Sequence, residues 1–127
     1  MHPTLFTATE VSNNANNTAR FHCVVTRHHG AAQWVQSQLG HAVRTVVHLE
    51  AQAIEVGGRY YGVFPLHLAA AICAAGSECW AITFNMPLAS RGQELSAAQL
   101  DALGAQLVRH EVSAVATALQ RSGAVAA

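Results

Sequence analysis

Apolar runs alternate with segments of helical character through most of the chain. The first run, 21–26, is apolar up to Thr26 except for His22, as expected of a strand that is covered on both faces. A segment rich in β-branched residues follows at 43–49, and further apolar runs lie at 60–64 and 79–84. We predict a strand at each of these positions.

Helical patterns and their stop signals separate the runs. The segment 31–39 places Trp34 and Leu39 on one face and ends at Gly40. Pro65 is suited to a helix start, and an Ala-rich helix is predicted over 66–75. A helical turn is expected over 50–56, before a Gly-Gly pair.

A capping-box spacing at Ser96 and Gln99 opens the last predicted helix. Its apolar positions follow helical spacing, and they are Leu100, Leu103, Leu107, Val112, Val115 and Leu119. We therefore expect one long helix there, which Gly104 could interrupt.

Strands that alternate with helices indicate an α/β domain with a mainly parallel sheet of about four strands. We expect a three-layer arrangement. Right-handed connections then place the loops 26–30, 65–67 and 85–94 along the carboxyl edge of the sheet. Ligands bind at this edge in open α/β sheets.

The chain reads as one domain over 20–121. A polar, Asn-rich run at 12–18 marks residues 1–19 as a disordered leader, and the tail 122–127 is expected to fray. No stretch approaches about 18 consecutive apolar residues, and no secretory signal is recognisable, so we predict a cytoplasmic protein without a membrane partner. The three cysteines fit reduced thiols.

Charge argues against binding to long nucleic acids. The formal net charge is zero, and no broad basic face is expected. All seven basic residues are Arg, which suits bidentate phosphate contacts and also fits codon bias. A small anionic ligand held by a few local cations remains compatible.

The segment 24–31, Val-Val-Thr-Arg-His-His-Gly-Ala, is the strongest candidate site. It passes from a strand into a helix, whose first N–H groups and dipole favour an anion. Arg27 adds a planar charged fork, and Thr26, His29 and the Gly30 backbone would orient a phosphate. The alternative is a plain strand-to-helix turn with an exposed Arg.

Other candidates lie on the converging loops. Pro65, His67 and Asn85 could contact a ligand, although His67 could equally be a packed or capping residue. Trp34 could stack on a base, but it is more often a core residue. The sequence contains no clustered metal ligands, so we expect neither a metal nor another cofactor.

Four blocks together resemble a small family of type III CRISPR accessory proteins, the Csx-sixteen proteins. The blocks are 25–31 with Trp34, 62–69, 87–95 and 96–107. The resemblance implies a ring nuclease that cleaves cyclic oligoadenylate, most simply the tetra-adenylate. Related CARF-type proteins further imply a Rossmann-like homodimer with a composite site on its two-fold axis. His29 departs from an expected Pro, and Gly58 from an expected acidic residue.

The leading hypothesis is metal-independent attack by a ribose 2′-OH, which leaves a 2′,3′-cyclic phosphate. Arg27 and Arg91 would bind phosphate and stabilise charge, and His28 would move the proton. Glu94 would orient a partner such as Arg91. Two alternatives stay open: a protein that sequesters the ring without cutting it, and a phosphatase of the phosphohistidine type.

Overall fold

The computed structural model describes residues 5–6 and 19–115, and these form a six-stranded sheet in the order β1-β6-β5-β4-β2-β3. Four strands are mutually parallel: β2 (His22–Val25), β3 (Arg44–Val46), β4 (Arg59–Gly62) and β5 (Glu78–Thr83). They confirm the four predicted strands. The α/β class and the mostly parallel sheet are therefore confirmed, whereas the strand count is higher than predicted.

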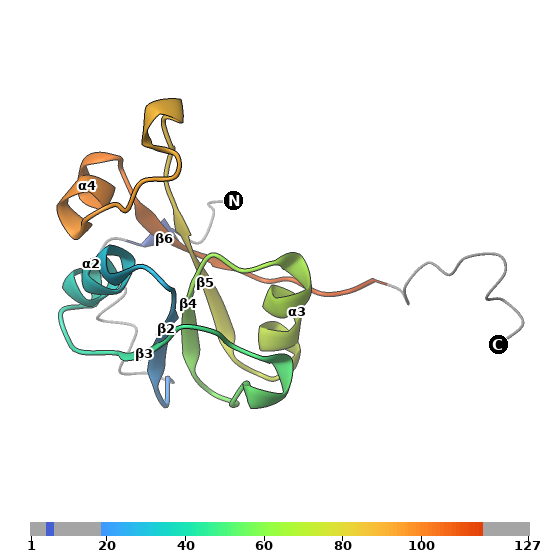
Figure 1. The fold of residues 1–127 in the computed structure, drawn as a ribbon. Coiled ribbons are helices and arrows are strands. Elements are labelled where there is room, and N and C mark those ends of the chain that lie inside the picture. Colours follow the sequence, from blue (N-terminus) through green and yellow to red (C-terminus); the bar gives the residue numbers. More distant parts are fainter. Residues whose placement is uncertain (1–4, 7–18, 116–127) are drawn as a thin grey trace, which may run out of the picture.

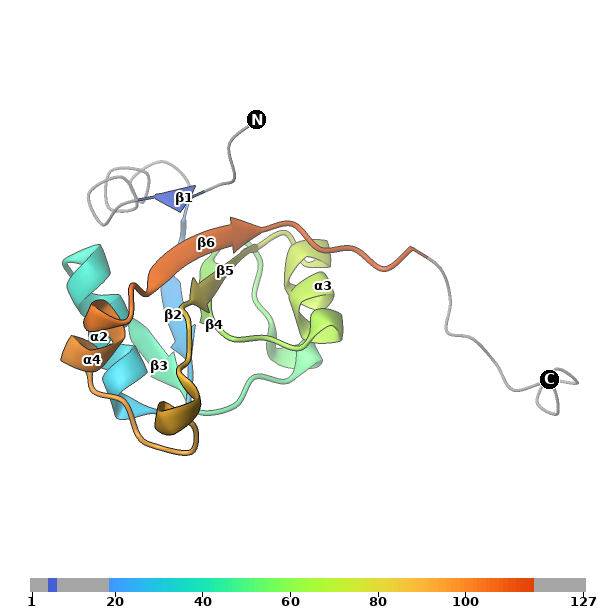
Figure 2. The same cartoon turned by 90° about the horizontal axis from the view of Figure 1, so that it is seen from above.

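Helices cover both faces of the sheet (Figures 1 and 2). On one face, α2 (His29–Leu39) and α4 (Ala97–Ala102) lie over a core that includes Val24, Tyr61 and Trp80. On the other face, α3 (Leu66–Ala74) packs over Cys23, Tyr60 and Cys79. Neighbouring residues of β2, β4 and β5 thus point into different cores, because side chains alternate along a strand.

The two helices predicted before α4 are present, although α2 begins at His29, two residues before the predicted start at residue 31. Helix α2 ends at Leu39, and its C-cap Gly40 has a positive φ of 79°, which glycine readily adopts. Pro65 is the N-cap of α3. A short 3₁₀ helix, η1 (Ala51–Ala53), lies where a helical turn was expected, and a second, η2 (Leu88–Ser90), lies in the predicted loop.

The prediction of one long final helix was wrong. Helix α4 begins at the predicted capping box of Ser96 and Gln99 but ends at Ala102. Gly104 then takes a positive φ of 77°, and the chain continues as β6 (Gln106–His110), antiparallel to β5. Leu100 and Leu107 still enter the same core, one from a helix and one from a strand. Their helical spacing therefore did not require a continuous helix.

Strand β1 (Leu5–Phe6) pairs antiparallel with β6. Apart from these two residues and Ala19, the predicted leader lies outside the described residues, as do the predicted tail and Leu119. Among the residues that are described, no helix is long and apolar enough to cross a membrane.

Candidate functional site

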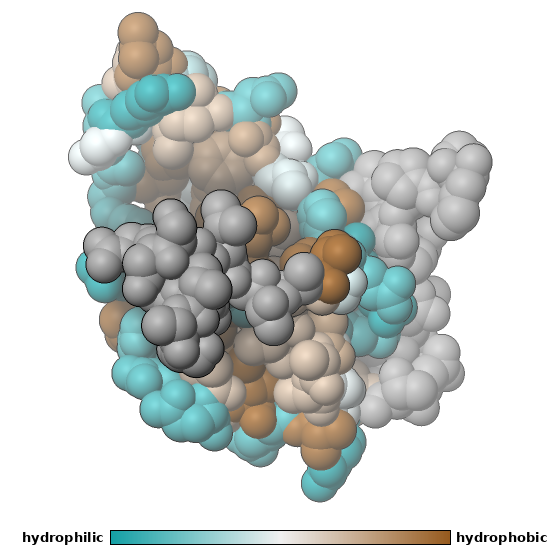
Figure 3. Space-filling model, turned by 90° about the vertical axis from the view of Figure 1, so that its right-hand side faces the viewer, coloured by the Kyte–Doolittle hydropathy of each residue, from teal (hydrophilic) through white to brown (hydrophobic). Residues whose placement is uncertain are grey.

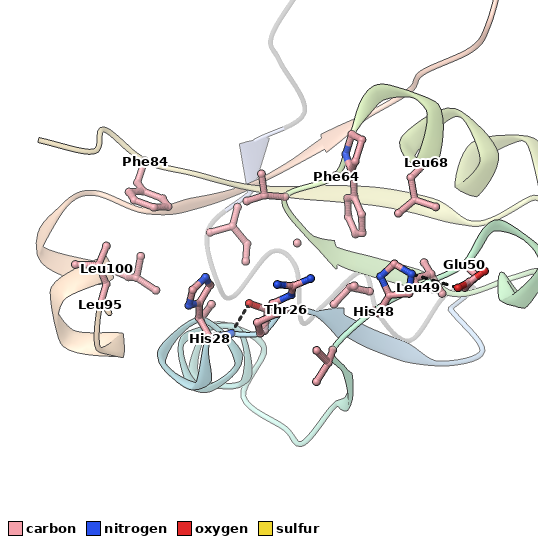
Figure 4. Close-up of a pocket in the computed structure, with 18 of the residues that line it drawn as sticks. Thr26, His28, His48, Leu49, Glu50, Phe64, Leu68, Phe84, Leu95 and Leu100 are labelled. Atoms are coloured by element: carbon pink, nitrogen blue, oxygen red, sulfur yellow. Dashed lines mark hydrogen bonds and ion pairs between the residues drawn. The ribbon is translucent and has the colours of Figure 1, made fainter. Parts of the chain in front are cut away.

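A cavity of about 860 Å³ opens at the carboxyl ends of β2, β4 and β5 (Figure 4). The chain reverses its winding direction here, because β2 lies between β3 and β4. Such reversal points are the usual ligand sites of open α/β sheets. The predicted loops do converge on it, since its lining includes Thr26, Arg27, His28, Pro65, His67, Met86 and Gln93.

The turn after β2 holds Arg27 at the cavity. The backbone N–H of Thr26 donates to the Val46 carbonyl at 2.9 Å, which fixes the end of β2 against β3. The hydroxyl of Thr26 accepts from the backbone N–H of His28 at 3.0 Å, which tightens the turn. Arg27 is exposed between these two anchored residues, and His28 is the N-cap of α2. The guanidinium can therefore meet a ligand near the N-terminus of α2.

His28 is paired with Glu94 from the loop before α4. Its Nδ1 lies 2.9 Å from both carboxylate oxygens of Glu94. Both side chains are exposed, at 61% and 65%, so a ligand can reach them. The expected partner of Glu94 was Arg91, and the structure assigns His28 instead.

Gly30 is required by packing. A Cβ at this position would collide with the backbone carbonyl of Leu95, so α2 can approach the segment before α4 only with glycine here. This close approach also brings Glu94, the neighbour of Leu95, to His28. Gly30 thus shapes the site from a buried position.

The opposite wall of the cavity carries residues that the sequence reasoning missed. His48 and Glu50, in the segment between β3 and η1, line the cavity, and His48 Nε2 lies 3.4 Å from Glu50 Oε2. Figure 4 shows them on the far side of Thr26 from His28. The same rule that located the other loops could have found them, because they follow a parallel strand at its carboxyl end.

Several predicted residues do not line the cavity. Trp34 is only 1% exposed and packs in the core, so its core role agrees with the structure and the candidate role in base stacking does not. His29, Asn85 and Arg91 are exposed but contribute nothing to the cavity wall. Arg91 directly follows η2, in a segment that projects beyond the end of β5 (Figure 1).

A polar network lies at the other end of the sheet. The Tyr61 hydroxyl and Nδ1 of His22 are joined by a hydrogen bond of 2.7 Å, and Arg59 pairs with Glu78 at 2.8 Å. Burial, followed by the nearby His41 and Arg59, lowers the pKa of His22 from 6.5 to about 4. Burial likewise raises the pKa of Tyr61. Both groups are neutral at pH 7, as a structural network requires.

The two buried cysteines, Cys23 and Cys79, offer no activated nucleophile. Cys23, Cys73 and Cys79 are free, and Cys23 and Cys79 are buried. Burial raises the pKa of Cys79 to about 11, followed by the effect of Cys73, so its thiol stays protonated at neutral pH. Within the described part of the chain, no group of three or more His, Cys, Asp or Glu residues is arranged to hold a metal ion.

The chain matches one protein-family model, described as "Putative CRISPR-associated protein (Cas_VVA1548)", over residues 23–113. This range runs from β2 to just beyond β6, and it contains every residue that lines the cavity. No curated protein and no solved structure matches the chain significantly.

Proposed function

The chain belongs to this CRISPR-associated family, and from that membership and the chemistry of the cavity we propose that it is a ring nuclease. Its substrate would be cyclic oligoadenylate, the messenger of type III CRISPR defence, with the tetra-adenylate ring as the leading candidate. The order of the parallel strands, β3-β2-β4-β5, supports the expectation of a Rossmann-like fold.

The observation that carries the proposal is the His28–Glu94 pair beside Arg27 at a cavity lined by both apolar and polar side chains. Donation from Nδ1 of His28 to Glu94 leaves Nε2 of the neutral ring as a proton acceptor. A base and a cation placed beside the reacting phosphate are what phosphodiester cleavage by a neighbouring hydroxyl needs.

The reaction uses the ribose itself as the nucleophile. Nε2 of His28 takes the proton of a 2′-OH, and the 2′-oxygen bonds to the adjacent phosphorus while the bond from phosphorus to the 5′-oxygen breaks. Arg27 stabilises the charge that develops on the phosphoryl oxygens. Protonation of the departing 5′-oxygen, by water or the imidazolium, gives a linear product with a 2′,3′-cyclic phosphate and a 5′-OH.

The proposal includes a homodimer with a composite site. One cavity of about 860 Å³ suits a drug-sized ligand, whereas a ring of four nucleotides is much larger. Large apolar side chains are also exposed at and near the cavity mouth: Val47, Val63 and Leu66 are 64%, 76% and 78% exposed. Figure 3 shows apolar groups at the tip of the projecting segment as well. A second copy would cover these groups and contribute a second Arg27 to the ring.

Product analysis tests the activity directly. Purified full-length protein is incubated with cyclic tri-, tetra- and hexa-adenylate in excess EDTA, and the nucleotides are separated by chromatography. We expect multiple turnovers of one ring size to a linear product ending in 2′,3′-cyclic phosphate. Loss of all cleavage under chelation would contradict the metal-independent mechanism. Intact ring bound at one per dimer would show sequestration instead.

A further inference from the structure

One wall of the cavity is formed by η1 and the residues just before it. This wall carries a row of polar side chains. Glu50 lies at its centre: Oε2 is 3.4 Å from Nε2 of His48, and Oε1 accepts a hydrogen bond from Nε2 of Gln52 at 2.9 Å. All three residues line the cavity. None of them takes part in the proton transfer assigned to His28.

Glu50 fixes the orientation of the Gln52 amide. A Gln side chain has two N–H donors and one carbonyl acceptor, and the bond to Glu50 uses one donor. The carbonyl oxygen and the second N–H then remain as an adjacent acceptor and donor. This pair is complementary to the N6 amino group and the neighbouring ring nitrogen of adenine, the same match that Gln makes to adenine in nucleic-acid recognition. In the same base orientation, guanine places a carbonyl oxygen where adenine has its amino group, so it does not match the amide there.

Apolar side chains beside this wall can hold the flat faces of a base. Leu49 precedes Glu50, and Phe64 and Leu68 lie across the cavity from it (Figure 4). Phe64 is half-buried at the end of β4, where its ring approaches Gly62. An aromatic face contributes about 1–3 kcal/mol to the stacking of one base.

On the basis of the proposed function, we infer that Gln52, held by Glu50, selects adenine in the half of the cavity between η1 and α3. The phosphate of the same nucleotide unit would then lie toward Arg27, and the neighbouring nucleoside would lie toward His28. Gln52 is thus a specificity-determining residue, and Glu50 is its positioning residue.

The test pairs a change in the protein with a change in the ring. The affinities of wild type and Gln52→Leu are measured for cyclic tetra-adenylate and for the same ring built from purine riboside, which lacks the N6 amino group. In wild type, loss of the amino groups should weaken binding about tenfold or more. In Gln52→Leu the two rings should bind within about twofold of each other, because the selecting group is gone.

Two further variants isolate the roles. Glu50→Ala should reduce the discrimination between the rings, since the amide loses its anchor. Gln33→Leu, at an exposed position of α2 outside the cavity wall, should discriminate as wild type does. Equal discrimination by wild type and Gln52→Leu would overturn the inference while leaving the ring nuclease intact. A wild-type protein that neither binds nor cleaves the unmodified ring would overturn the proposed function itself.

Discussion

His28 and Glu94 are 66 positions apart in the chain, yet Nδ1 of His28 lies 2.9 Å from each carboxylate oxygen of Glu94. The contact joins the N-terminus of α2 to the loop before α4. It fixes which ring nitrogen of His28 faces the cavity. Glu94 therefore acts by orienting the imidazole of His28.

Removal of the imidazole should slow cleavage more than it weakens binding. For His28→Ala we expect a loss of about 10²- to 10⁴-fold in the single-turnover rate, with ring affinity nearly unchanged. Glu94→Gln should cost less, because the base itself remains and only its orientation is less firmly held. Rapid-quench cleavage and a separate binding titration measure the two effects. A dead Glu94→Gln beside a near-normal His28→Ala would show that the base is Glu94.

Arg27 should matter for both affinity and rate. Arg27→Ala removes the planar fork that contacts the phosphate, so ring binding and cleavage should fall together. Arg27→Lys should recover only part of the activity, since an ammonium cannot make the bidentate contact. Arg20→Ala serves as a matched control at an exposed position outside the cavity wall. Equal losses in Arg20→Ala and Arg27→Ala would indicate a general charge effect.

Gly30→Ala should destabilise the fold and disturb the site. Its methyl group would collide with the Leu95 carbonyl, and overpacking of this kind costs about 1–3 kcal/mol. The shift would also move Glu94 away from His28, so cleavage should slow. Urea unfolding and cleavage assays measure the two consequences. Gln33→Ala on the same helix should stay within about 0.5 kcal/mol of wild type, and a similar value for Gly30→Ala would mean that the close approach is not required.

Stability should decrease as pH falls from about 6.5 to about 4. His22 is kept neutral in the folded protein, with its pKa lowered to about 4, whereas it titrates near 6.5 when unfolded. The unfolded chain therefore binds more protons in this window, and protonation favours unfolding. His22→Asn keeps an acceptor near the Tyr61 hydroxyl but cannot titrate. Between about pH 6.5 and about pH 4, the free energy of unfolding of His22→Asn should fall by on the order of 1–2 kcal/mol less than that of wild type. Urea unfolding at several pH values measures this difference. Parallel pH curves for the two proteins would contradict this assignment.

Local sequence patterns were sufficient for the parallel core of the fold. The apolar run before Thr26 and the Gly40 stop predict β2 and α2 because burial on both faces and helix termination depend on nearby residues. The end of α4 was missed for a different reason: Leu103 and Leu107 keep helical spacing across Gly104. Only pairing with β5, a distant segment, shows that Leu107 belongs to a strand.

The candidate site was predicted only in part, because local sequence patterns encode only those features that are contiguous in the chain. Arg27 and His28 are recognisable because a strand end, a turn and a helix start are contiguous in the sequence. The pairing of His28 with Glu94 depends on how closely α2 approaches Leu95, which local patterns do not encode. His48 and Glu50 were overlooked because the segment between β3 and η1 contains no recognisable sequence motif.

The sheet ends at β3, a strand of only three residues in which Arg44 and Thr45 are exposed. An edge this short offers few backbone groups to an incoming strand, and a charged side chain on it discourages further pairing. The protein is thus protected against edge-to-edge aggregation on this side. A second copy that covers the apolar mouth of the cavity would do so through side chains, without extending the sheet into a continuous fibre.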